Sequence, residues 1–157
     1  SHLSFQRYLT HIMLLEITSA TEFLCRLIPS GQLSTVQVDE LKKQLAQLMS
    51  DKFSSHWDVD QPFVGNAYRA ICNFAGRMDP LLYSAAVHSQ VEPSIIEQYL
   101  PKDLVLWIDP FSVSYRVGDH GLVRTLYEDR SRGKVTLKSP SPKGQTSPKK
   151  LNYVLAN

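Results

Sequence analysis

The chain has 157 residues, of which 43% are hydrophobic and 10% aromatic, and its formal net charge is +2. Residues 1–129 carry 10 Lys and Arg against 15 Asp and Glu, whereas residues 130–157 carry seven Lys and Arg and no acid. An acidic body argues against a nucleic-acid-binding domain, and no run approaches the roughly 20 apolar residues of a membrane span. The N-terminus lacks a secretory signal pattern, so we expect one intracellular domain with a basic tail.

The first part of the chain has the spacing of two amphipathic helices. Residues 1–9 are a polar-aromatic lead, and from Thr10 onward an apolar stripe recurs every three or four residues. After Pro29-Ser30-Gly31, the pair Ser34 and Gln37 forms a capping-box pattern that begins a second helix. The two core faces consist of Met13, Ile17, Ala20, Phe23, Leu24, Leu27 and Ile28, followed by Leu41, Leu45, Leu48 and Met49. The short connection predicts an antiparallel helix pair.

Residues 56–100 combine a loop, one strand and two short helices. Pro62 and Gly65-Asn66 indicate a loop, and the run from Tyr68 to Phe74 is typical of a strand. Asp79-Pro80 and Glu92-Pro93 each place an acid before a proline, which favours helix starts at these two points.

The stretch from Leu100 to Gly118 alternates strongly and predicts two strands. Leu104, Leu106 and Ile108 fall on one face, whereas Val105 and Trp107 fall on the other. Asp109-Pro110 ends the first strand, and a second alternating run leads to the turn Gly118-Asp119-His120-Gly121 and a returning strand at 122–127. Helices followed by antiparallel strands predict an α+β domain at 10–129, with short helices packed against a small antiparallel sheet.

A strand that is apolar on both faces is either sandwiched or offers one face to a partner. Trp is enriched in binding hot spots, so we expect Trp107 to be an interface residue. Asp109 lies on the same face, where it could pair with a basic residue of that partner. For Arg69 the sequence leaves a structural ion pair equally open.

Residues 130–157 cannot bury enough apolar surface to fold alone, and we expect disorder there. Ser139, Ser141 and Ser147 each precede a proline and fit phosphorylation by a proline-directed kinase, although unmodified linker serines are an equal alternative. The end of the tail, 151–155, is either a linear docking motif or simply a tail.

The search for catalytic chemistry finds no motif. The five histidines are scattered singly, and the chain has no C-x-x-C pair, phosphate-binding loop or nucleophile elbow. The most metal-like cluster, His56-x-Asp58-x-Asp60, is better explained as a solvated loop. Cys25 and Cys72 sit in apolar contexts that favour buried free thiols. We therefore predict no catalytic residue, no metal and no cofactor.

Two segments resemble the signature boxes of the BTG/Tob antiproliferative family. LPKDLVLWIDPFSVSYRVGDHG is similar to the second box, and the spacing of His56-Trp57, Pro62, Gly65 and Tyr68-Arg69 is similar to the first. Met78-Asp79-Pro80 and the Tyr127-Glu128 ending also match, and the terminal SPKKLNYV resembles the short-tailed BTG branch. The resemblance covers about residues 15–129.

The resemblance implies a non-enzymatic adaptor, in the cytoplasm and nucleus, that binds the DEDD-type catalytic subunit of the Not-containing deadenylase complex. Such an adaptor promotes poly(A) shortening of mRNA and restrains proliferation. The residues implied for deadenylase binding are Tyr68, Trp107 and Asp109. The resemblance also implies, through a less exact match of the turn motif, that the hairpin contacts poly(A)-binding protein. The residues of this contact are Gly118, Asp119, Gly121, Tyr127 and Glu128.

The first box departs from the family pattern, because Asp58-Val59 replaces an aromatic-Pro pair and YRAICNF replaces YRCIRIN. The family Glu before Val-Ser-Tyr is Ser112, and His120 replaces an acid in the turn. A second hypothesis keeps the same apolar face for a nuclear co-regulator that contacts transcription factors, or for a weakly self-associating scaffold. A metal-dependent nuclease ranks third. Neither nucleic acid nor membrane is an expected partner.

Overall fold

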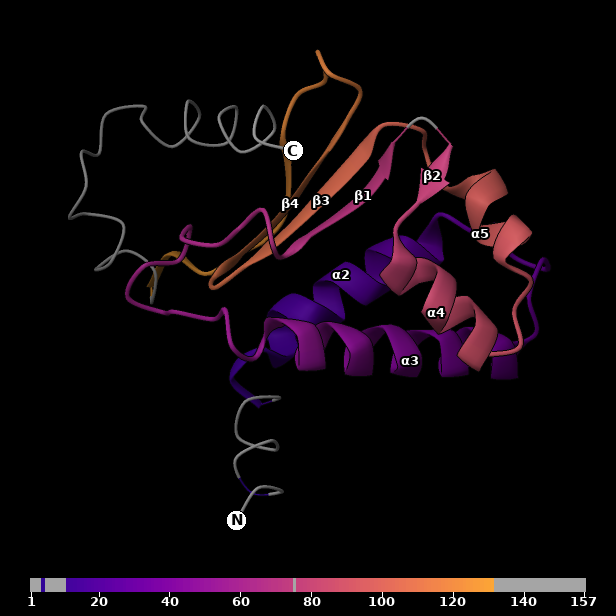
Figure 1. Ribbon diagram of the computed structural model, residues 1–157, viewed down its shortest axis with the longest axis horizontal. Helices are drawn as coiled ribbons and strands as arrows, with labels where there is room; N and C mark the ends of the chain where they lie inside the picture. The colour runs from indigo at the N-terminus through magenta and orange to yellow at the C-terminus, as the bar shows by residue number, and fades with distance from the viewer. Residues whose placement is uncertain (1–3, 5–10, 75, 132–157) are drawn as a thin grey trace.

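The computed structural model describes residue 4 and the ranges 11–74 and 76–131. Within them, four helices cover one face of a five-stranded antiparallel sheet, as Figure 1 shows. The predicted α+β class is therefore confirmed. Calls on the lead at 1–9 and on the tail after residue 131 lie outside the described residues, apart from residue 4.

Of the two long helices, one packs on the sheet and the other packs on the first. Helix α2 spans Leu14–Arg26 and helix α3 spans Thr35–Phe53, and the two run in opposite directions (Figure 1). The predicted capping box is confirmed, since the Ser34 hydroxyl accepts from the Gln37 N–H at 3.1 Å while the Gln37 side chain accepts from the Ser34 N–H at 3.0 Å. Helix α2 contacts β3, β4 and β5, whereas α3 contacts α2 and α4.

The two short helices follow the first hairpin. Helix α4 spans Pro80–His88 and helix α5 spans Pro93–Tyr99, each with the predicted proline in its first turn. Asp79 caps α4, because its carboxylate accepts from the Leu81 N–H at 2.9 Å. The other oxygen of Asp79 accepts from the Cys72 N–H at 3.1 Å, which ties α4 to the sheet.

The sheet has the strand order β2-β1-β3-β4-β5. Its strands are β1 (Ala70–Phe74), β2 (Arg77–Met78), β3 (Leu104–Asp109), β4 (Ser112–Val117) and β5 (Arg124–Glu128). The predicted strand at Tyr68 begins two residues later, and the returning strand runs from 124 rather than 122. Strand β3 is central, and all six of its residues are buried.

The alternation predicted for β3 is confirmed. Leu104, Leu106 and Ile108 belong to the main core with the helices, whereas Val105 and Trp107 form a second cluster on the opposite face. Helices α2 and α3 supply Ile17, Ala20, Phe23, Leu24, Leu41, Leu45, Met49 and Phe53 to the main core, together with Met13 at the N-cap of α2. The sheet thus has two apolar faces, and the helices lie on one of them (Figure 1).

Candidate protein-binding site

Arg69 is the most highly connected side chain at the end of the sheet where β3 stops. It is completely buried, and each of its five N–H groups has an acceptor. Four acceptors are backbone carbonyls and the fifth is a carboxylate oxygen. They are Ile108 O at 2.9 Å, Val64 O at 3.0 Å, Pro62 O at 2.7 Å, Asp109 Oδ1 at 3.0 Å and His56 O.

These contacts hold a long irregular loop against the sheet. Residues 54–69 connect α3 to β1 at the end of the sheet (Figure 1). Three of the carbonyls that accept from Arg69 belong to this loop, and the Trp57 ring lies 5.7 Å from the guanidinium carbon. The loop is therefore pre-organised even though it has no regular secondary structure.

Tyr68 directly precedes Arg69 and is the exposed aromatic residue of this region. Its side chain is 43% exposed. The His56 ring stacks on it with centroids 3.9 Å apart, and Lys52 Nζ lies 5.0 Å from the ring centre. The stacked histidine and the buried arginine next along the chain restrict the ring, so Tyr68 presents a large contact area at low entropic cost.

Trp107 lies close to this region but does not reach the surface. The sequence led us to expect an interface residue, and in the structure its side chain is 0% exposed. It packs with Ala70 and Val105, and the half-buried Cys72 and Phe74 lie against the same cluster. Whether Trp107 supports binding of a deadenylase stays a prediction.

On sequence alone Asp109 could pair with a basic residue of a partner, and in the structure it pairs with a basic residue of the same chain. It is 0% exposed and its carboxylate accepts from Arg69 Nη2 at 3.0 Å. Arg69 thus forms a structural ion pair, which the sequence had left open. The pair joins the segment around Tyr68 to the segment around Trp107, and these segments are the two motif boxes of the sequence.

The hairpin residues divide between surface and core. Asp119 is 83% exposed, and the Glu128 side chain is 38% exposed and lies 3.3 Å from Arg130 Nε. Tyr127 packs instead against the main core. Gly118 has a φ of +79°, and a Cβ at Gly121 would lie 2.0 Å from the Val117 carbonyl oxygen, so both glycines are required by the turn.

The two cysteines are free and half-buried. Burial raises the pKa of the Cys25 thiol to about 11, and burial followed by the nearby Asp79 charge raises the pKa of Cys72 to about 11. A protonated thiol is a poor nucleophile.

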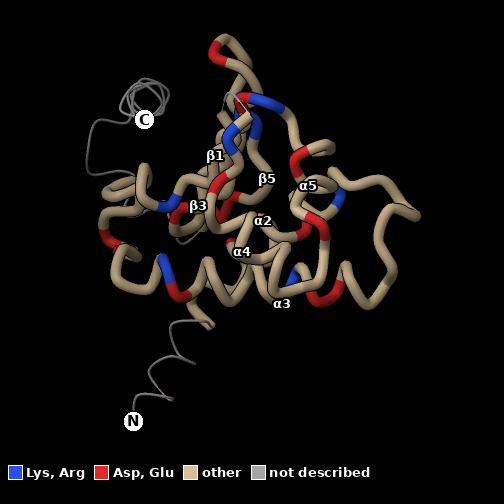
Figure 2. The backbone as a smooth tube through the Cα atoms, turned by 45° about the vertical axis from the view of Figure 1, so that its right-hand side comes forward, with Lys and Arg blue, Asp and Glu red and all other residues tan. Residues whose placement is uncertain are grey.

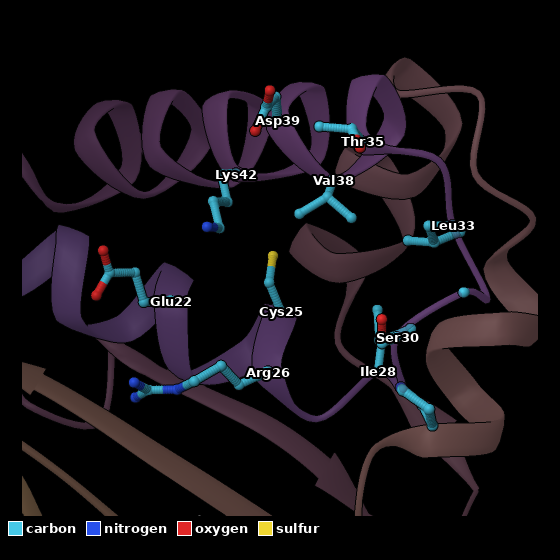
Figure 3. Close-up of a pocket in the computed structure, with 12 residues that line it drawn as sticks. Glu22, Cys25, Arg26, Ile28, Ser30, Leu33, Thr35, Val38, Asp39 and Lys42 are labelled. Carbon is cyan, nitrogen blue, oxygen red and sulfur yellow. The ribbon is translucent and has the colours of Figure 1, made fainter.

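Cys25 lines a cavity of about 540 Å³ between the end of α2 and the start of α3, where Figure 3 shows it with Glu22 and Lys42.

The described residues hold no group of three or more His, Cys, Asp and Glu side chains placed to bind a metal ion. The cluster His56-x-Asp58-x-Asp60 has the most metal-like pattern in the sequence. In the structure Asp58 Oδ1 accepts a hydrogen bond from the Asp60 N–H at 2.9 Å, which is a local turn contact. Helices long and apolar enough to cross a membrane are also lacking in this part of the chain. Figure 2 shows acidic residues spread over helices, strands and loops.

Comparison with known proteins places these features in a family. A model of the BTG family matches residues 13–127, which include the loop, the Arg69–Asp109 pair and the hairpin. The chain belongs to the BTG family. It is 34% identical to rat protein BTG2 over 148 residues, covering 91% of this chain and 92% of the relative.

Other members of the family are similarly related. Chicken protein BTG1 is 33% identical over 122 residues, covering 77% of this chain and 71% of that protein. Rat protein Tob1 is 34% identical over 119 residues, but these cover only 32% of Tob1, which fits the predicted short-tailed branch. The solved BTG/Tob domain of C. elegans FOG-3 has the same fold, with a TM-score of 0.67, 24% identity and coverage of 80% of this chain and 98% of that one.

Sequence reasoning missed the central role of Arg69 in this BTG-family domain. Its acceptors lie up to 40 positions away, and most of them are backbone carbonyls, which no side-chain pattern reveals. The available signal was an arginine followed by the apolar run of a buried strand, because a charge in such a position needs partners. Ser139, Ser141 and Ser147 lie outside the described residues.

Proposed function

We propose that this chain is a non-enzymatic adaptor that binds the DEDD-type catalytic subunit of the Not-containing deadenylase complex. Binding would bring that subunit to mRNA, promote poly(A) shortening and so restrain cell proliferation. Membership of the antiproliferative BTG/Tob family supports the general role. The deadenylase is proposed as the partner because the two motif boxes resemble those of the family.

One observation carries the location of the binding site. Tyr68 is exposed on a loop that a completely satisfied arginine fixes against the sheet. Rigid aromatic residues in pre-organised segments are favoured as binding hot spots. In this proposal Tyr68 contacts the partner, whereas Arg69 and Asp109 position the loop that carries it.

The test compares two exposed tyrosines of the full chain. Tyr68→Ala should weaken binding of the purified deadenylase subunit by about 2 kcal/mol or more, roughly thirtyfold, as expected for a truncated hot spot. Tyr83→Ala is the matched control, because Tyr83 on α4 is 55% exposed and far along the chain from the loop. Isothermal titration calorimetry would measure both, and equal affinities for the two variants would contradict the proposal.

A second contact, with poly(A)-binding protein, is proposed for the β4–β5 hairpin. It is supported by the exposed carboxylates of Asp119 and Glu128 and by the motif match of the turn. Tyr127 would then act from the core side of β5 and hold the strand in place. The two partners would occupy different parts of the chain, which is what a bridging adaptor requires.

A further inference from the structure

The loop that connects α3 to β1 presents a surface that is both apolar and acidic. Val64 is 60% exposed, Val59 is 39% exposed and Tyr68 is 43% exposed. Asp58 and Asp60 flank Val59 in the chain, and both are exposed. Among the described residues neither carboxylate has an ion-pair partner. A segment that binds this loop should therefore carry positive charge next to apolar side chains.

The cations near the loop do not cancel this negative charge. Arg69 is completely buried, and its guanidinium is used by acceptors of the same chain. Lys52 lies at the end of α3 with its Nζ 5.0 Å from the centre of the Tyr68 ring. The exposed Asp51 directly precedes Lys52 and offsets its charge. The loop surface thus keeps the excess negative charge of its two aspartates.

The described part of the chain ends on the same side of the sheet as this loop. The Asp129 N–H donates to the Phe111 carbonyl oxygen at 2.8 Å. Phe111 lies two residues after Asp109, whose carboxylate pairs with Arg69 of the loop. Residue 131 and the loop therefore lie at the same end of the sheet (Figure 1).

The sequence that follows residue 131 has the composition that the loop surface requires. Residues 132–157 contain six Lys and Arg and no acid. Lys149-Lys150 is their one pair of adjacent cations, and the mildly apolar run at 151–155 follows it directly. An extended chain advances roughly 3.3 Å per residue, so the 18 positions from residue 131 to Lys149 can span roughly 60 Å, about three times the length of a six-residue strand.

We propose that the segment at 149–155 binds the loop surface around Tyr68 in the free chain. The two lysines meet the carboxylates of Asp58 and Asp60, and the apolar residues of the segment cover the exposed apolar side chains of the loop. The inference rests on the proposed function and adds regulation of the same site to it. A segment that covers Tyr68 competes with the deadenylase subunit, and the apparent affinity falls with the fraction of chains whose site is open.

The tip of the β4–β5 hairpin is a second exposed surface, and it fits the basic segment less well. Its exposed apolar residues are Val117, Leu122 and Val123. Asp119 Oδ1 lies 3.6 Å from a guanidinium nitrogen of Arg116, and Arg124 is an exposed cation of the same hairpin. Positive charge is thus already present at this tip, whereas the loop surface lacks it.

Charge reversal in the tail of the full chain tests the contact without any partner. Lys149→Glu/Lys150→Glu should shift the amide resonances of residues 58–68 in proton–nitrogen correlation spectra, because the segment leaves the loop. Lys134→Glu/Lys138→Glu is the matched control, since it makes the same charge change outside the segment, and it should leave these resonances in place. Resonances that stay unshifted in both variants, or that shift equally in both, would overturn the inference. A shift that depends on protein concentration would assign the contact to a second copy and overturn the intrachain binding.

Binding of the purified deadenylase subunit to the same full-length variants separates this inference from the proposed function. Lys149→Glu/Lys150→Glu should bind about fivefold more tightly than the wild type, the size expected for the loss of two exposed ion pairs that hold the competing segment. The control variant should bind like the wild type. Unchanged affinity of Lys149→Glu/Lys150→Glu alongside weakened binding by Tyr68→Ala would overturn the inference alone. A wild-type chain that fails to bind the subunit, while the resonances shift as expected, would overturn the proposed function and support the intrachain contact.

Discussion

Asp109 and Arg69 form a buried ion pair whose loss should destabilise the fold. Asp109→Ala leaves a buried guanidinium without the carboxylate that pairs with it, and removing one partner of such a pair costs about 3–5 kcal/mol. Equilibrium unfolding in urea measures the change. Asp109→Asn, which keeps an acceptor oxygen, should lose less stability, and Glu97→Ala on the exposed side of α5 should lose almost none.

If Asp109→Ala proved as stable as the wild type, the positioning role given to this pair would be wrong. If it lost stability as expected, a loss of partner binding by the same variant would not identify Asp109 as a contact. Tyr68 is exposed, and within the described part of the chain its ring is contacted by the His56 ring and Lys52, so it is the residue at which binding and stability can be separated.

At the scale of elements, the start of α3 depends on a local contact that sequence alone predicted. Ser34→Ala removes the hydroxyl that accepts from the Gln37 N–H and should cost about 1 kcal/mol of unfolding free energy. Urea unfolding would measure it, with the exposed neighbour Thr35→Ala as the control. Equal stability of the two variants would show that the cap is not formed in solution.

Elements were predictable where the deciding interactions are local. The cap at Ser34 and the proline-led starts of α4 and α5 follow from residues a few positions apart. The alternation of β3 likewise assigned Leu106 and Trp107 to opposite faces. It could not say whether the second face is covered, because burial depends on segments distant in sequence, and the complete burial of Trp107 was therefore not predicted.

For the whole molecule, the strand order predicts how protection from hydrogen exchange is distributed. Strand β3 is central and buried on both faces, so its amides should exchange only on global unfolding. Amides of β5, at the edge of the sheet and largely exposed, should exchange faster. Hydrogen exchange followed by mass spectrometry would test this, and equal protection of the two strands would contradict the strand order.

The two motif boxes show what a sequence can reveal about this candidate site. Their resemblance to the family directed attention to this region, because motif spacing is a property of the sequence. The sequence could not predict which of these residues is exposed and which is buried, because Asp109 pairs with Arg69, which lies 40 positions away in the chain. Tyr68 keeps its surface position, whereas Asp109 turns inward, and only the folded backbone distinguishes the two.

The acceptors around Arg69 also bear on how the loop can evolve. Four of the five are backbone carbonyls, at His56, Pro62, Val64 and Ile108, and every residue type supplies a carbonyl. Residues between these carbonyls can therefore be substituted while the backbone conformation of the loop is kept. The Asp58-Val59 sequence, which departs from the family pattern quoted above, lies between two of these carbonyls, those of His56 and Pro62. The surface beside Tyr68 can thus vary in sequence while the backbone frame beneath it stays unchanged.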